Sequence, residues 1–102
     1  MKLIERLGEM IDDEIGDAMN YATMAVNYKW DRPELADVFF RISNEELGHM
    51  DLLHKQVVNV IEEYRREKGE PPADMMAVYE YLHKKRIEQV GKVRMMQAQY
   101  RG

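Results

Sequence analysis

The sequence predicts an all-α protein built from three helices. Apolar residues recur at spacings of three, four and seven in three long stretches, as they do on helical faces, and no stretch alternates as a strand would. Two short proline-containing segments separate these stretches, and the 102 residues include only 6 glycines and 3 prolines. This length is enough for one small domain and too short for two, so we expect a single domain over residues 1–102.

The first helix is expected over residues 1–30. The apolar and small residues that define its face are Leu3, Leu7, Met10, Ile11, Ala18, Ala22, Ala25 and Val26. The helix should end in the segment "YKWDRPE", because Pro33 is tolerated at the start of a helix but not in its interior. Trp30 falls in this turn and is expected to cap the end of the helical hairpin.

The second helix is expected over residues 33–68. Its apolar stripe consists of Leu35, Val38, Phe39, Ile42, Leu53, Val57, Val60, Ile61 and Tyr64. The segment "EKGEPPAD" should end it, with Gly69 as the C-cap and two prolines shortly afterwards. At a rise of 1.5 Å per residue, the first two helices extend about 40 to 50 Å. The short turn between them predicts an antiparallel hairpin.

The third helix is expected over residues 74–100, with Asp74 as its N-cap and a role in packing or oligomerisation. Its apolar face consists of Met75, Tyr79, Leu82, Val90, Val93, Met96 and Tyr100. A two-helix hairpin buries little surface by itself. The long apolar stripes, together with the third helix, therefore predict that the chain completes its core with a second copy of itself.

The composition argues against several classes of protein. A formal net charge of -4 with mixed signs does not fit a nucleic-acid-binding surface, which needs a clustered basic face. The absence of cysteine excludes disulfides, thiolate zinc sites and thiol nucleophiles. The N-terminal segment lacks the apolar core of a signal peptide, and no run approaches the ~20 apolar residues of a membrane span, so we expect a cytoplasmic protein without membrane contact.

Two glutamates and a histidine interrupt the apolar stripes of the first two helices. Glu46 and His49 fall between Ile42 and Leu53 at steps of four, three and four, and Glu14 interrupts the first stripe in the same way. Glu14 lies about 17 residues before the turn and Glu46 about 15 residues after it, so an antiparallel hairpin brings them level within about one helical turn. We therefore expect Glu14, Glu46 and His49 to converge in the interior.

A metal ion is the favoured explanation for such a cluster. Buried carboxylates that face each other are costly, and a cation removes that cost. Carboxylates with an imidazole suit iron, manganese or zinc. Alternatively, His49 is a neutral core histidine and Glu46 pairs with Arg41 or another base. A plain helical bundle without metal would require Glu14 and Glu46 to be protonated or paired in the interior.

These residues resemble the half-motif of the ferritin-like di-iron carboxylate superfamily, which includes the rubrerythrins and the two-helix encapsulated ferritins. In that superfamily one helix supplies a Glu and, about thirty residues later, the next supplies Glu-x-x-His; here Glu14, Glu46 and His49 match. The segments "EIGDAMNYATMA" and "RISNEELGHMDLL" extend the resemblance over about residues 5 to 60. By this resemblance we expect Tyr21 to be a core residue or a hydrogen-bond partner of the metal ligands, and a redox-active tyrosine is the alternative.

The resemblance implies a homodimer or higher homo-oligomer. A complete site in this family takes four carboxylates and two histidines from four helices, and one chain supplies half of them. Two chains would form a ferritin-like four-helix bundle with two iron ions per dimer, and manganese or zinc would accept the same ligands. The implied activity is ferroxidase-type oxidation of Fe(II) by O₂ or peroxide, an oxidoreductase reaction with no catalytic residues other than the metal ligands.

A second Glu-x-x-His, Glu80 and His83, lies in the third helix. The turn near residue 71 predicts that it lies level with residues 59 to 62, about 20 Å from the proposed site, and so takes no part in it. His54 follows His49 by five residues and is expected to face elsewhere, at the surface or rim.

The competing function is structural. The whole chain, including "GEPPADMMAVYEYLHKKRIEQV", also resembles small uncharacterised proteins encoded among phage and prophage genes. That resemblance implies a helical structural or assembly protein with protein partners and a structural or vestigial metal site.

Overall fold

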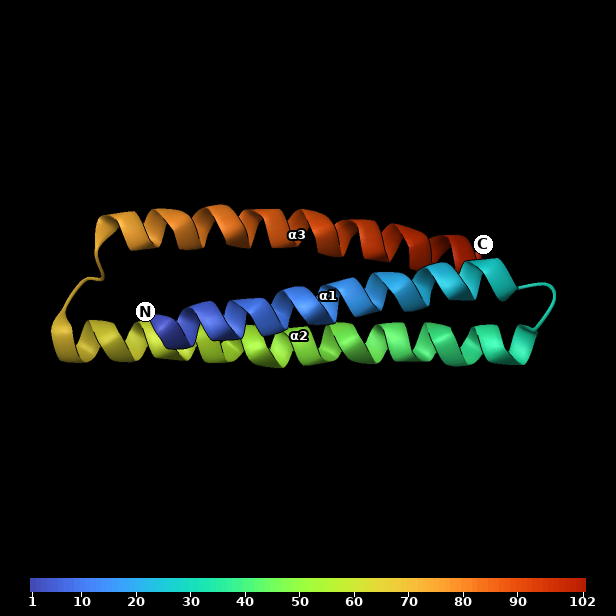
Figure 1. Ribbon diagram of the computed structural model, residues 1–102, viewed down its shortest axis with the longest axis horizontal. Coiled ribbons are helices and arrows are strands. Elements are labelled where there is room, and N and C mark those ends of the chain that lie inside the picture. The colour runs from blue at the N-terminus through green and yellow to red at the C-terminus, as the bar shows by residue number, and fades with distance from the viewer.

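Three long helices form the whole of the computed structural model, which describes residues 1–102 (Figure 1). Helix α1 spans Lys2–Tyr28, α2 spans Pro33–Lys68 and α3 spans Ala73–Arg101. The all-α prediction is confirmed, and each helix begins and ends within about two residues of the predicted bounds. The molecule is a rod of 56 × 18 × 18 Å.

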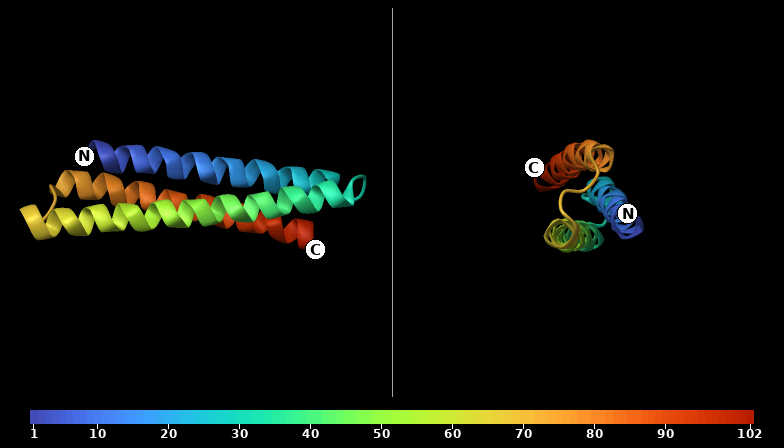
Figure 2. Two further views of the ribbon diagram at one scale, coloured as in Figure 1. Left: turned by 90° about the horizontal axis from the view of Figure 1, so that it is seen from below. Right: turned by 90° about the vertical axis from the view of Figure 1, so that its left-hand side faces the viewer.

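Helices α1 and α2 form the predicted antiparallel hairpin (Figure 2). Pro33 stands at the first position of α2, where its missing N–H costs no hydrogen bond. The Arg32 N–H donates to the Tyr28 carbonyl at 2.9 Å, which closes the turn through the backbone. The prediction that Trp30 caps the hairpin is wrong: its side chain is 83% exposed, and only the Lys29 ammonium lies over its ring.

Small residues line the contact between α1 and α2. Those that are fully buried there are Ala18, Ala22, Ala25, Ala36 and Ser43. Small side chains let two helices approach closely, so the two helices contact each other along the sides that carry these residues. The core beside this contact is formed by Ile11, Ile15, Leu47, Val57 and Ile61, to which α3 adds Val93.

The predicted apolar stripe of α2 is therefore only partly buried. Val57 and Ile61 lie in the core, but Leu35 and Val38 are 41% and 48% exposed. The side of α2 that faces α1 carries Ala36, Ser43 and Leu47 and not Leu35 and Val38. The larger apolar residues are left on one side of the hairpin.

We call this side the open face. It consists of the exposed residues Leu3, Met10, Met24, Tyr28, Leu35 and Val38. Their helical spacing places them on the same side as Glu14 and Glu46. Helix α3 does not cover them, because it lies along the other side of the hairpin (Figure 2).

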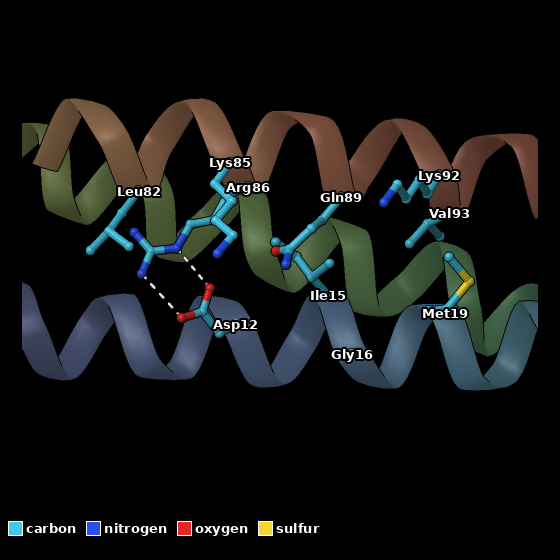
Figure 3. A pocket seen from close by; sticks show the side chains of 10 residues that line it. All are labelled: Asp12, Ile15, Gly16, Met19, Leu82, Lys85, Arg86, Gln89, Lys92 and Val93. Atoms are coloured by element: carbon cyan, nitrogen blue, oxygen red, sulfur yellow. Dashed lines mark hydrogen bonds and ion pairs between the residues drawn. The ribbon is translucent and has the colours of Figure 1, made fainter. Parts of the chain in front are cut away.

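Helix α3 packs mainly against α1 and contacts α2 at fewer points. The Arg86 guanidinium forms two bonds with the Asp12 carboxylate, at 2.7 and 3.1 Å (Figure 3). The predicted apolar face of α3 is confirmed, since Val93 is buried and the six other residues of that face are half-buried. The predicted N-cap is wrong: Pro72 holds that position, and the Asp74 carboxylate accepts a hydrogen bond from the Met75 N–H.

A polar chain joins α3 to the hairpin. The Gln97 side-chain amide donates to the Ser43 hydroxyl at 2.9 Å, and this hydroxyl donates to the Ala18 carbonyl at 2.7 Å. The Arg94 guanidinium bonds both the Gln97 side-chain oxygen and that of Asn44. Gln97 is only 4% exposed, so these bonds fix the position of α3 in the core.

Replacing Gln97 by alanine should destabilise the protein. The change removes a buried hydrogen-bond partner of Ser43 and leaves a small cavity, so the free energy of unfolding should fall by about 1–3 kcal/mol. Urea denaturation followed by circular dichroism measures this. The matched control is Gln99→Ala on the exposed side of α3, which should shift the free energy by less than about 0.5 kcal/mol. Equal losses in both variants would contradict the assignment.

Candidate metal site

The structure brings Glu14, Glu46 and His49 together. Glu14 comes from the middle of α1, and Glu46 and His49 lie one turn apart on α2. One potential ligand atom from each residue lies within 4.8 Å of the others. Glu14 and Glu46 therefore lie level with each other along the hairpin, as the sequence predicts. No other group of three acidic or histidine side chains in the chain converges in this way.

The three side chains of the cluster lie close together, but they are not within the distance of a strong hydrogen bond. His49 Nδ1 lies 3.4 Å from Glu14 Oε2 and 3.9 Å from Glu46 Oε2. Glu14 Oε2 is buried and accepts no hydrogen bond. A buried carboxylate oxygen without a partner is costly, so this atom is positioned to accept a proton, a donor or a cation.

The carboxyl group of Glu14 perturbs the titration of Glu46. The pKa of Glu46 is raised above its ordinary value, chiefly because its protonated form can donate a hydrogen bond to the Glu14 carboxylate and its ionised form cannot. Burial and the negative charge of Glu14 raise this pKa further, and His49 opposes them. Two carboxylates thus occupy a space that favours only one negative charge unless a cation joins them.

The sequence predicts this site in the interior of the molecule. In the structure the site lies instead at the edge of the open face. The Glu14 and Glu46 side chains are 25% and 18% exposed, and that of His49 is 55% exposed. The difference has the same cause as the shift of the α2 stripe: the small residues take the contact between the helices. In one chain, the ligands therefore face outward among apolar residues.

Neighbouring side chains do not satisfy the cluster. Arg41, the alternative partner of Glu46, bonds Asp37 at 2.9 Å instead. Tyr21 is half-buried, and its ring lies 6.0 Å from that of Phe39. It forms no hydrogen bond with the cluster, so its predicted role as a hydrogen-bond partner stays a prediction.

The second Glu-x-x-His does not join the cluster, but its predicted level is wrong. His83 stacks on His54 with ring centres 4.8 Å apart, so it lies level with residue 54 and not with residues 59 to 62. The cause is the linker over residues 69–72, which turns back so that α2 projects beyond the start of α3 (Figure 1). His54 faces away from the cluster, as the sequence predicts, and is half-buried by this stack.

The groove between α1 and α3 is a different kind of feature. It has a volume of about 360 Å³ and is lined by Asp12, Arg86 and the stems of Lys85 and Lys92 beside Ile15 and Val93 (Figure 3). Its only carboxylate, that of Asp12, is paired with Arg86. We therefore assign it to the packing of α3 and not to metal binding.

The stacked histidines should make stability depend on pH. Burial is the main cause of the lowered pKa of His54, and the charges of His83 and Arg86 lower it further, against the opposing effect of Asp51. The unfolded chain, with a histidine pKa near 6.5, then binds more protons than the folded chain. This contribution to stability should be complete above pH 6.5 and should be lost as the pH falls from 6.5 through the lowered pKa.

Urea denaturation between pH 7.5 and 5 measures this effect by comparison with His54→Phe, which keeps a ring in the stack but cannot titrate. The wild-type protein should lose more stability than the variant over this range. Parallel pH profiles would contradict the prediction.

The fold and site together define a three-helix protein with a carboxylate–histidine cluster on an uncovered side of a helical hairpin. Comparisons with protein-family models, with curated proteins and with solved structures give no match to this chain. None of the three helices contains a stretch long and apolar enough to cross a membrane.

Proposed function

We propose that this chain is a ferritin-like metal-binding protein that completes a di-iron site by pairing with a second copy of itself. The observation that supports the proposal most strongly is the cluster of Glu14, Glu46 and His49 at the edge of the open face, with a buried Glu14 oxygen that has no partner. A cation would neutralise the two facing carboxylates and supply that missing partner.

The donor set suits iron. Carboxylate oxygens are hard anionic ligands that stabilise the ferric state, and an imidazole binds iron in both oxidation states. Manganese and zinc accept the same donors, so the chemistry of the ligands favours this group of metals over calcium or magnesium.

The second copy supplies what one chain lacks. One chain offers three ligands, and a pair related by a twofold axis would offer four carboxylates and two imidazoles. The same pairing would cover the exposed apolar side chains of the open face, including Leu35 and Val38. One contact between copies would thus answer both the incomplete site and the uncovered apolar surface.

The activity that we propose for this arrangement is that of a ferroxidase. Two Fe(II) ions as substrate, one per chain, would each give up one electron, and O₂ would take up both electrons with two protons to form hydrogen peroxide. In this chain Glu14 and Glu46 would bind the iron and balance the added positive charge of Fe(III). His49 would orient the ion from the side of α2.

Anaerobic titration of the metal-free protein with Fe(II), followed by admission of air, tests the proposal. We expect about one iron per chain and a ferric absorbance that appears on oxidation. Binding of less than about half an iron per chain, without ferric absorbance, would contradict it.

A structural or assembly role is the second candidate. Four large apolar residues of α3 are exposed, namely Val78, Tyr81, Ile87 and Met95. They lie outside the hairpin that resembles the ferritin-like proteins, and they would suit a protein partner. In this role the metal would only hold the fold together, so its removal should unfold the chain and not merely inactivate it.

A further inference from the structure

A pair of histidines lies on the side of the hairpin away from the open face. The rings of His54 on α2 and His83 on α3 are nearly parallel, with an angle of 13° and ring centres 4.8 Å apart. The Tyr79 ring also stacks on that of His83, with ring centres 5.8 Å apart. The pair is a direct side-chain contact between α2 and α3.

The two imidazoles border a small cavity with further donor atoms. This cavity has a volume of about 230 Å³. Besides the two histidines, its lining includes the Met50 thioether and the Asp51 carboxylate. Imidazole nitrogens, a carboxylate and a thioether are all ligands of borderline transition-metal ions.

Binding of one ion by both histidines requires a change in the orientation of one ring. Two nitrogens that bind one ion at about 2.0–2.1 Å each can lie up to about 4 Å apart. The two rings are nearly parallel, so their in-plane lone pairs do not meet in this structure, and one ring must rotate about its side-chain bonds for a nitrogen of each to bind one ion.

The charges nearby also permit a cation. Arg86 borders the cavity, but the Asp12 carboxylate on α1 binds its guanidinium at 2.7 Å. Asp51 adds a negative charge from α2. Burial keeps His54 neutral near pH 7, so a nitrogen lone pair is available there.

We propose that His54 and His83 form a second metal site, which binds a divalent ion of the copper, nickel and zinc class and fastens α3 to α2. This site is separate from the carboxylate cluster, and it does not depend on the function proposed for that cluster. Because the ion would link α2 and α3 directly in the folded chain, its binding should raise the thermal stability of that chain.

Titration of the whole protein with Cu²⁺, followed by electron paramagnetic resonance, tests this proposal. Two bound nitrogens give a hyperfine pattern that a site with a single histidine does not give. We expect that pattern in the wild-type protein and in Glu46→Gln, in which the carboxylate cluster is damaged. His83→Phe and His54→Phe keep the stacked rings without a ligand nitrogen, so each should lose the pattern and bind this Cu²⁺ at least about tenfold more weakly.

Thermal melting gives an independent measurement. Cu²⁺ should raise the melting temperature of the wild-type protein and leave that of each phenylalanine variant unchanged. The proposal would be overturned if the wild-type protein showed no two-nitrogen pattern, or if the pattern survived in either phenylalanine variant. If one variant fails to fold, the other provides the same comparison.

Discussion

Replacing Glu46 by glutamine is expected to weaken iron binding by more than about 100-fold, because loss of a direct ligand should exceed the 10–100-fold cost of losing a residue that only supports one. The glutamine keeps the size of the side chain but cannot supply an anionic oxygen. Titration of the metal-free variant with Fe(II) measures the loss.

The same change should stabilise the metal-free protein. In the wild-type chain Glu46 and Glu14 repel each other, and Glu14 Oε2 accepts no hydrogen bond. The amide of a glutamine can donate to that oxygen without adding charge. We therefore expect the free energy of unfolding at pH 7 to rise by about 1 kcal/mol in urea denaturation.

Glu45→Gln is the matched control, because Glu45 is the adjacent residue and is exposed. It should leave both iron binding and stability unchanged. If Glu46→Gln binds iron as the wild-type protein does, the cluster is not the iron site. If Glu46→Gln loses iron and also unfolds the dimer, the metal has the structural role of the second candidate function.

The second large effect is expected at the open face. Val38 is 48% exposed in the single chain and would be buried between two copies. Val38→Asp would place a charge in that contact without a partner, at a cost of several kcal/mol. The dimer should therefore dissociate at concentrations at least about 100-fold higher than the wild-type dimer does.

Iron binding should weaken in the same variant, although Val38 is not a ligand, because each chain alone holds only half of the proposed site. Val78→Asp on α3 is the control, since Val78 is also an exposed valine, at 59%. It should change neither the mass in solution nor iron binding. Sedimentation of both variants at several concentrations, with and without Fe(II), makes the comparison. Equal behaviour of the two would contradict the proposed contact.

Much of the fold can be predicted from the sequence because its signals are local. Pro33 and Gly69 mark the start and the end of α2, and helical spacing places the apolar residues on faces. The levels of Glu14 and Glu46 follow from the same information, because a short turn fixes how two antiparallel helices align.

The contact side of α2 was harder to predict. The pattern gives most weight to large apolar residues such as Leu35 and Val38, but close packing of Ala18 and Ala22 against α2 decides which side faces inward. Hydrophobic spacing alone cannot distinguish a side buried within one chain from a side left for another. For this reason the cluster was expected in the interior and lies instead at the edge of the open face.

The sequence does not predict the stack of His54 and His83, for a related reason. It depends on how far the linker over residues 69–72 turns back along α2, and the sequence indicates a turn there without its path. The five-residue step from His49 to His54 did carry a signal, because it places His54 on the opposite side of α2, where α3 lies.

Native mass spectrometry of the protein loaded with Fe(II) tests the central claim most directly, because it reports the number of chains and of metal ions in the same particle. The account predicts a particle of twice the 12.1 kDa chain mass that carries two iron ions. A single chain with iron bound as tightly, or a dimer without iron, would contradict it.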